Sequence, residues 1–258
     1  MDSKIKALVS GTKTFGDKES IIYIKDVDCS IAFHGLEEMD ADVDLISGWH
    51  HLHKEDFESY NVCIGGVNDC RLALSRLGIN NYDIPCYPNE LYNFFGRKIE
   101  MGYIQDIIFG LYHFERNGHK FVKPVRPKRF NAFITDNKNA LDMLYDVDPV
   151  ERVYISELIS FSSEWRVYVR EGKIVKICNY AGHPYIFPNI TVINFMIKAF
   201  KGPCCYAIDV GIRGDTTYLV EVNDCYSLGN YGLFPDEYAE MLLLRWKELT
   251  SNKYHYDS

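Results

Sequence analysis

Two apolar runs near the C-terminal end, Cys204–Val210 and Thr217–Val222, constrain the fold of this chain more than any other feature. A glycine-containing segment, residues 211–215, joins them, and this layout predicts the two arms of an antiparallel hairpin. The first arm carries Asp209, and the second ends in the triplet Glu221-Val222-Asn223. The hairpin therefore brings acidic and amide side chains together on neighbouring strands.

Side chains alternate between the two faces of a strand, so Glu221 and Asn223 are predicted to point the same way, while Val220 and Val222 point into the opposite layer. Together with Asp209 they supply two carboxylates and an amide carbonyl. These are the oxygen ligands that Mg²⁺ prefers, especially where substrate phosphates complete its coordination. A solvated hairpin edge is the alternative interpretation, and the rest of the chain has to decide between the two.

The composition excludes several classes of protein. The 258 residues, 47% of them hydrophobic, suffice for a sizeable core and predict two lobes. A net charge of -8 argues against long-range attraction to nucleic acid or to an anionic membrane. We expect a cytoplasmic protein without a membrane partner, because no run approaches about 18 apolar residues and the start lacks a signal-peptide layout. The eight cysteines include no C-x-x-C pair, which predicts buried free thiols.

Short apolar runs alternate with polar breaks over residues 1–88, and Asn68–Leu77 carries a helical stripe. Strands that alternate with helices predict a small α/β domain. The Gly65-Gly66 pair between a predicted strand and this helix is either a plain tight turn or a place where backbone amides approach a ligand. His50, His51 and His53 lack a cysteine or a spaced carboxylate pair that would complete a metal site, so they are predicted to be structural.

The segment from Pro88 to Leu111 has apolar residues at steps of three and four, which predicts a long helix that Gly96 and Gly102 interrupt. Further helices are predicted over residues 136–145, 189–201 and 236–249.

A lysine lies within the apolar strand Phe121–Val125. A buried ammonium group needs a counter-charge, so Lys123 points to an anion. Arg126, Lys128 and Arg129 follow and form a basic loop in an acidic protein. Phosphate is the favoured partner of this segment, and nucleic-acid backbone is the second choice.

A second hairpin is predicted from the runs 164–170 and 173–180, which flank Glu171-Gly172. Its first strand has a polar face, formed by Glu164, Arg166 and Tyr168. A cross-strand salt bridge is the structural interpretation of that face. In combination, the lysine strand, the basic loop, this arginine and the Asp…Glu-x-Asn group supply the cations and metal ligands that phosphoryl transfer needs.

These segments resemble the ATP-grasp superfamily over roughly residues 85–250. The matching pieces are Phe121-Val122-Lys123-Pro124, residues 154–159, 164–168, 207–211 and 219–223. More narrowly, the chain is similar to compact ATP-grasp proteins common in phages and bacteria, in which a Lys-x-Phe segment follows, here Lys128-Arg129-Phe130. An upstream Arg97-Lys98-Ile99 also fits.

The resemblance implies an α+β fold in which two α+β lobes sandwich ATP. The ATP-grasp domain would span residues 89–258, with a small lobe at about 115–160 and a large lobe at about 161–250. A small α/β domain, residues 1–88, would precede it.

The resemblance also implies roles for individual residues. Lys123 and Arg166 would be catalytic, Lys123 on the phosphates and Arg166 on the transferring phosphate. One or two Mg²⁺ ions would be held by Asp209, Glu221 and Asn223. The nucleotide would further contact the hinge Glu157, Leu158 and Ile159, with Glu157 or Glu164 on the ribose. The usual glycine-rich phosphate loop is replaced by the glycine-free segment 125–131, where Lys128 and Arg129 would cover the phosphates.

The implied activity is an ATP- and Mg²⁺-dependent carboxylate–amine ligase that acts through an acyl phosphate on small-molecule or peptide substrates. A phosphotransferase and a non-catalytic nucleotide- or RNA-phosphate-binding module are the alternatives. We expect the acceptor pocket between the ATP-grasp domain and residues 1–85. The Gly65-Gly66 turn, the histidines and Arg97 are its candidate contributors, and Cys225–Gly232 is a candidate wall.

Overall fold

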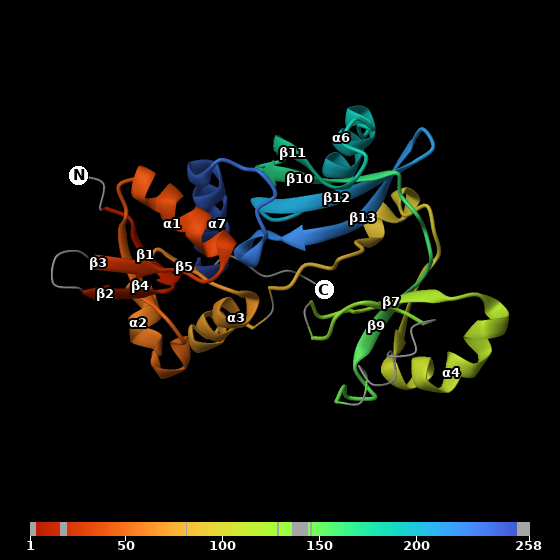
Figure 1. Cartoon of the computed structure of the whole chain (residues 1–258), viewed down its shortest axis with the longest axis horizontal. Coiled ribbons are helices and arrows are strands. Elements are labelled where there is room, and N and C mark those ends of the chain that lie inside the picture. Colours follow the sequence, from red (N-terminus) through yellow and green to blue (C-terminus); the bar gives the residue numbers. More distant parts are fainter. Residues whose placement is uncertain are drawn as a thin grey trace.

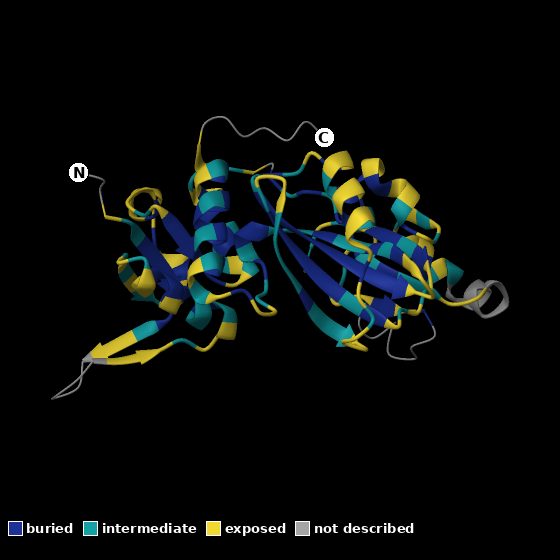
Figure 2. Ribbon diagram, turned by 90° about the horizontal axis from the view of Figure 1, so that it is seen from above, coloured by how far each residue is buried: buried dark blue, intermediate teal, exposed yellow. Residues whose placement is uncertain are grey.

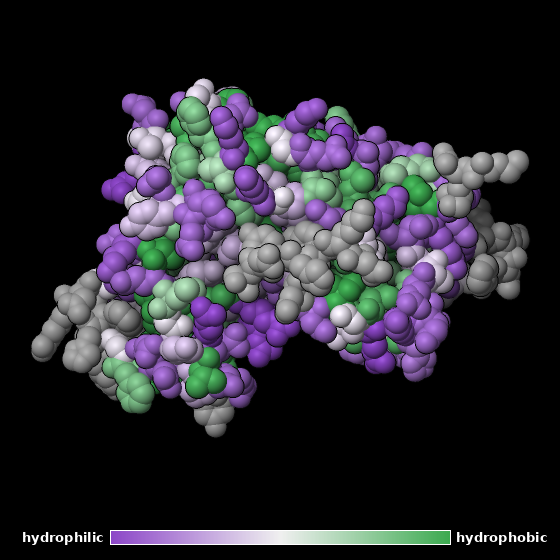
Figure 3. Space-filling model, turned by 180° about the vertical axis from the view of Figure 1, so that it is seen from behind, coloured by the Kyte–Doolittle hydropathy of each residue, from purple (hydrophilic) through white to green (hydrophobic). Residues whose placement is uncertain are grey.

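The protein has a mixed α+β architecture built around three main sheets. The computed structural model describes residues 4–15, 20–80, 82–127, 129–135, 144 and 146–251, with only the backbone of residues 15, 20 and 111–117. Figure 1 shows an N-terminal part at the left, a large sheet at the top and a smaller sheet with one helix at the lower right. In the view from behind, a notch in the lower outline separates the left and right parts (Figure 3).

The N-terminal part is a three-stranded parallel sheet in the order β4-β1-β5. This confirms the alternation of strands and helices that the sequence predicts. Its strands are β1 (Lys6–Ser10), β4 (Asp42–Ile46) and β5 (Val62–Ile64). Its helices are α1 (Val27–Glu38), α2 (Lys54–Glu58) and α3 (Val67–Arg76), with a 3-10 turn η1 (Trp49–His51). A separate hairpin, β2 (Thr12–Phe15) and β3 (Ser20–Tyr23), extends from this part.

The last described helix, α7 (Pro235–Thr250), packs against α1 and β5. Its buried face includes Leu242 and Trp246, which belong to the same core as Leu8 and Leu36 of the N-terminal part. The C-terminal helix therefore completes the N-terminal core. The boundary near residue 88 stays a prediction.

The smaller sheet is antiparallel, in the order β6-β9-β7-β8. It consists of β6 (Ile99–Tyr103), β9 (Arg152–Glu157), β7 (Lys120–Pro124) and β8 (Phe133–Ile134). Ile104 and Ile107 of α4 (Ile104–Asn117) share a core with Val122 and Val153 of this sheet. The helix predicted over residues 136–145 lies outside the described residues, except for Leu144, which is buried in the same core.

The long helix predicted from Pro88 to Leu111 is wrong. The segment forms a 3-10 turn, η2 (Asn89–Phe94), then β6, and only then α4. Gly96 has φ of +63°, and a Cβ there would lie 2.2 Å from the Tyr218 ring, so the backbone must turn at this point. Residues 99–103 then pair with β9, because cross-strand hydrogen bonding outweighs a helical spacing of apolar residues.

The large sheet is also antiparallel, in the order β11-β10-β12-β13. Its strands are β10 (Ser163–Arg170), β11 (Lys173–Gly182), β12 (Cys205–Arg213) and β13 (Thr216–Asp224), which confirms both predicted hairpins. The predicted turn is shorter than expected, because β12 continues to Arg213. One face packs against α6 (Ile190–Ala199), which begins at the predicted N-cap Asn189. The strands of this sheet are mostly buried, whereas α6 is partly exposed (Figure 2).

All eight cysteines are free thiols, and seven of them are buried, as the sequence predicts. Among the helices that the structure describes, none combines the length and the apolarity that a bilayer span requires.

The contact between α1 and α7 generates a stability prediction. A Cβ at Gly35 would lie 1.9 Å from the carbonyl oxygen of Pro235, so Gly35→Ala must separate the two helices. We expect this change to lower the free energy of unfolding by about 2–3 kcal/mol, which is the upper part of the range for overpacking. Urea unfolding of the variant measures the loss.

The control is Glu38→Ala, on an exposed position of the same helix. It should change the free energy of unfolding by less than about 0.5 kcal/mol. Equal stability of the two variants would contradict the close packing of α1 on α7.

Candidate active site

Three of the predicted site residues form one row across the large sheet. Arg166 on β10 pairs in register with Asp209 on β12, and Asp209 pairs with Glu221 on β13. Residues directly opposite each other on neighbouring strands share a face, so the three side chains lie together. Trp165 and Val167 point to the other face and enter the core under α6, which is the alternation that the sequence predicts.

Arg166 and Asp209 make a bidentate ion pair inside the protein. Arg166 Nε and Nη2 donate to the two Asp209 carboxylate oxygens at 2.8 and 2.7 Å, and both side chains are at most 8% exposed. Burial raises the pKa of the Asp209 carboxyl, and the guanidinium opposes that shift. Asn223 joins the cluster, since its Nδ2 donates to Asp209 at 3.0 Å and to Glu221 at 3.3 Å.

The fourth charged member of the cluster comes from the other antiparallel sheet. The ammonium group of Lys123, on β7, contacts the carboxylate of Glu221 as a short ion pair. Burial acts to raise the pKa of Glu221, but the charge and hydrogen bond of Lys123 outweigh it and hold this pKa below its ordinary value. Burial likewise acts to lower the pKa of Lys123, whereas neighbouring Cys86 and Glu221 raise it. The predicted anion partner of Lys123 is thus a carboxylate in this structure.

A β-bulge places Glu221 in this row. Asp209 pairs with Glu221 but the next residue, Val210, pairs with Leu219, so Val220 is the extra residue on β13. Leu219 is fully buried and Val220 is not, which corrects the predicted alternation at Val220.

Arg97 holds the bulge in place. Its Nη1 and Nη2 donate to the carbonyl oxygens of Leu219 and Val220 at 2.8 and 3.0 Å, and Nη1 also reaches Phe95 O. Arg97 therefore fixes the backbone just before Glu221. It does not line the cavity beside the cluster to which it was assigned as a candidate contributor.

The predicted hinge connects the two antiparallel sheets, because residues 158–162 lie between β9 and β10. Glu157 and Leu158 are exposed, and the Glu157 carboxylate accepts the Lys98 N–H at 3.0 Å. Glu164 shares the face of Arg166, and its carboxylate accepts the Tyr180 hydroxyl at 2.8 Å. Both acids thus have partners within the chain, and the ribose assignment stays open between them.

The basic loop is only partly described. Arg129 Nε lies 3.3 Å from a carboxylate oxygen of Glu151, which neutralises part of its charge. Lys128, the other residue predicted to cover phosphates, lies outside the described residues.

The donor set fits a hard divalent cation. Within the described residues no group of three or more His, Cys, Asp or Glu side chains is placed to hold a metal ion, so the candidate set is two carboxylates and one amide. This set leaves coordination positions for phosphates and water, as Mg²⁺ sites do. Asn223 donates through Nδ2 to both acids, so its side-chain amide must turn over before Oδ1 can ligate a cation.

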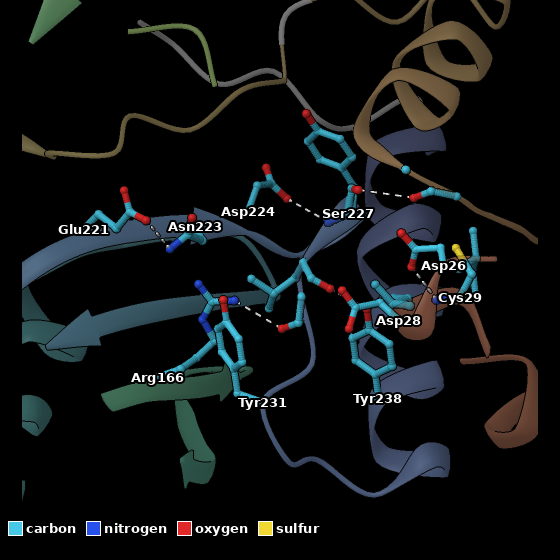
Figure 4. Close-up of a pocket in the computed structure, with 17 residues that line it drawn as sticks. Asp26, Asp28, Cys29, Arg166, Glu221, Asn223, Asp224, Ser227, Tyr231 and Tyr238 are labelled. Carbon is cyan, nitrogen blue, oxygen red and sulfur yellow. Dashed lines mark hydrogen bonds between the residues drawn. The ribbon is translucent and has the colours of Figure 1, made fainter. Parts of the chain in front are cut away.

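A cavity of about 360 Å³ adjoins the cluster. Figure 4 shows Arg166, Glu221 and Asn223 at one side and Asp26, Asp28 and Cys29 of the N-terminal part at the other. The Gly65-Gly66 turn and the segment 224–229 also line it, as expected, and no histidine is among its described lining residues.

Sequence reasoning missed several side chains of this site. Tyr231 lies under the Arg166 guanidinium at 4.5 Å from its ring centre and stacks on Tyr180. Asp28 enters the cavity from the start of α1. The tyrosine-rich character of residues 225–232 was the only sequence signal, and nothing local marks Asp28.

The Lys123–Glu221 pair generates a pH prediction. A carboxyl with a lowered pKa stabilises the folded state above its ordinary value of 4.5, and this contribution is lost as the pH falls through the folded pKa. In Lys123→Met only burial remains as the main influence, so the Glu221 pKa rises and stability falls as the pH increases. We therefore expect the variant to lose stability relative to wild type, by about 3 kcal/mol at pH 7 and by less toward pH 4.

Urea unfolding between pH 4 and pH 7 measures this difference. Lys98→Met is the control, because Lys98 pairs with Glu100 on the surface. Surface ion pairs contribute little to stability, so the difference between this control and wild type should be small and should not grow with pH. A difference for Lys123→Met that does not grow with pH contradicts the electrostatic coupling.

Solved structures show what this fold is similar to. D-alanine–D-alanine ligase from Bacillus anthracis aligns with a TM-score of 0.51 and 12% identity, over 97% of this chain and 99% of that chain. A RimK domain ATP-grasp protein from Sphaerobacter thermophilus DSM 20745 aligns with 0.50 and 12%, over 94% and 97%. Macrocyclase MdnC from Microcystis aeruginosa MRC, bound with precursor peptide MdnA, aligns with 0.50 and 11%, over 93% and 99%.

No curated protein sequence matches the chain. A family model described as an ATP-grasp domain, the second family of its clade, matches residues 94–241. This match is more than half of the chain and includes every residue of the Lys123–Arg166–Asp209–Glu221–Asn223 cluster. The chain therefore belongs to this clade of the ATP-grasp superfamily.

Proposed function

We propose that the protein is an ATP- and Mg²⁺-dependent ligase that joins a carboxylate to an amine through an acyl phosphate. The observation that carries this proposal is the contact between Lys123 on one sheet and the Arg166–Asp209–Glu221 row on the other. Two cations and two carboxylates meet between the sheets, next to a cavity. The solved structures of similar fold with ligase names support the same class of reaction.

The chain's own residues divide the work. Lys123 binds nucleotide phosphate, the hinge residues Glu157, Leu158 and Ile159 bind adenine, and Arg166 offsets charge on the transferring phosphate. Asp209, Glu221 and Asn223 would hold Mg²⁺, which supplies charge neutralisation for the phosphates when bound. Because Lys123 and Arg166 now contact Glu221 and Asp209, nucleotide binding requires at least part of this pairing to be exchanged.

The reaction balances without a protein nucleophile. A carboxylate oxygen attacks the γ-phosphorus, the bond to the β-phosphate oxygen breaks, and ADP leaves. The amine nitrogen then attacks the acyl carbon, the C–N bond forms, and phosphate departs with that carboxylate oxygen. Overall an ammonium, a carboxylate and ATP give an amide, ADP, phosphate and one proton. None of the eight thiols takes part, in keeping with the raised pKa of Cys29 and Cys63 through burial.

A phosphotransferase would use the same nucleotide residues and differ only in the acceptor. An RNA-phosphate-binding module is less favoured, because Arg129 of the basic loop already pairs with Glu151. The eight free thiols favour a reducing compartment, so cytoplasmic localisation stays part of the proposal.

Glu221→Gln tests the metal assignment. The change keeps the size of the side chain but removes the charge, so we expect ADP formation to fall about 100-fold or more. The control is Glu240→Gln, because Glu240 lies on α7 and pairs with Arg170 away from the cluster. This control should keep wild-type turnover. Unchanged ADP formation in a folded Glu221→Gln protein would sink the assignment.

The type of reaction is tested by incubating the protein with ATP, Mg²⁺ and pooled metabolites or peptides, followed by mass spectrometry. We expect ADP together with a condensed product whose mass is the sum of two substrates less one water. A phosphorylated product would replace the ligase with a phosphotransferase, and the absence of nucleotide turnover would contradict both.

A further inference from the structure

The cavity beside the reaction cluster has two unlike walls. One wall comes from the large sheet and includes Arg166 and Glu221. The other comes from the start of α1 and the Gly65-Gly66 turn, which lie outside the residues that define the family match. The N-terminal part thus supplies half of a binding site that opens directly onto the cluster (Figure 4).

Asp28 and Arg166 face one point in this cavity, above the α-carbon of Gly229. A Cβ built at Gly229 would lie 3.4 Å from Asp28 Oδ2 and 3.6 Å from Arg166 Nη1. The loop fixes both groups, because Asn230 N–H donates to Asp28 Oδ1 at 2.9 Å and Arg166 Nη1 donates to Gly229 O at 3.1 Å. A ligand atom at this point therefore contacts a carboxylate from one domain and a guanidinium from the other.

The charge at the N-terminal wall favours a cationic ligand. Of the carboxylates that line the cavity, Glu221 and Asp224 form ion pairs with Lys123 and Arg245. Asp26 accepts the Cys29 N–H, a neutral donor, as the N-cap of α1. Among the described residues that line the cavity, Arg166 is the sole cation, and it already pairs with Asp209. A ligand ammonium group beside Asp28 would balance this wall.

A second cavity, of about 480 Å³, continues the first. The two share Asp26, Cys29 and Gly66 as lining residues. A Cβ at Gly66 would meet nothing within 4 Å, so the space above this residue is open. The second cavity runs to Tyr23 at the base of the β2–β3 hairpin. The two cavities together form a trough from Arg166 to this hairpin, and we call it the acceptor trough.

The far end of the acceptor trough is apolar and exposed. Ile21, Ile22 and Tyr23 of β3 are 62%, 44% and 63% exposed, on a hairpin that stands away from the N-terminal part (Figure 2). Clefts of about 300–1,000 Å³ hold a drug-sized ligand, and each of the two cavities alone falls in this range. A free amino acid or a small amine would therefore use only the end next to Arg166.

We propose that the acceptor trough binds a polypeptide that presents an amine. Its ammonium group lies between Asp28 and the Gly229–Asn230 backbone, and its chain passes over Gly66 toward β2–β3. The inference rests on the proposed ligase function for the fate of the amine, but binding itself can be measured without turnover. Asp28 is in this scheme the residue that selects a charged amine.

The probe is a pool of random octapeptides containing lysine, used once with free amines and once after acetylation of every amine. Wild-type protein is mixed with each pool, both alone and with Mg²⁺ and a non-hydrolysable ATP analogue. Retained peptides are quantified by mass spectrometry after ultrafiltration. Free lysine serves as the small-amine probe.

Two variants examine the two ends of the trough. Asp28→Asn removes the charge and keeps an oxygen that can accept the Asn230 N–H. Gly66→Leu places a side chain in the open space between the cavities, at a φ of -59° that any residue adopts. Their controls are Asp236→Asn, an exposed aspartate in the first turn of α7, and Asn68→Leu, an exposed residue next to the trough. Thermal unfolding verifies that each variant folds.

We expect wild type to retain the free-amine pool at least about tenfold better than the acetylated pool. Asp28→Asn and Gly66→Leu should each reduce retention about tenfold, and the two controls should not. Equal retention of both pools, equal retention by Gly66→Leu and Asn68→Leu, or no retention by folded wild type overturns the proposal.

Failure here is distinct from failure of the ligase proposal. If a small amine is condensed with ATP turnover and Gly66→Leu has no effect, the ligase stands and the polypeptide acceptor falls. If peptide retention depends on Asp28 and Gly66 but Glu221→Gln leaves ADP formation unchanged, the acceptor trough stands and the metal assignment falls.

Discussion

The ion pair between Lys123 and Glu221 is the contact on which the candidate site depends, because it joins the two antiparallel sheets through charged side chains. A lysine on β7 and a glutamate on β13 would each be costly to bury alone. Held together, they bring the β7 cation beside the Arg166–Asp209 pair, and Asn223 links the two acids. The cluster is thereby nearly neutral, which allows four charged groups to lie in a mostly buried position.

The same cluster explains why backbone irregularity is needed at β13. Strict alternation along this strand would turn Leu219 toward the same face as Glu221, which carries the charged groups. The extra residue Val220 shifts the register, so Leu219 and Val222 both enter the core while Glu221 faces the ion pair. Arg97 donates to the carbonyl groups of the bulge, at Leu219 and Val220. An arginine before β6 thus supports the geometry of a strand more than a hundred residues later.

The N-terminal part is tied to this machinery by packing and by hydrogen bonds. Helix α7 contributes to the N-terminal core, so the end of the described chain holds the first domain against the large sheet. Arg71 of α3 donates to Pro127 O, at 2.8 Å, and contacts the hydroxyl of Tyr226. These contacts place Asp28 and Gly66 beside Arg166. The polypeptide acceptor proposed for the trough follows from this arrangement between domains.

The sequence by itself determined the local part of the site, and the tertiary structure decided the rest. Alternation along β10, β12 and β13 is a local property of period two, so it correctly placed Arg166, Asp209, Glu221 and Asn223 on one face. Helical spacing failed over residues 99–103, because the pairing with β9 is made by residues about fifty positions away. The bulge, the partner of Lys123 and the position of Asp28 opposite Arg166 also stayed hidden. Each depends on which distant strands and helices come into contact, and no local pattern of residue types records that choice.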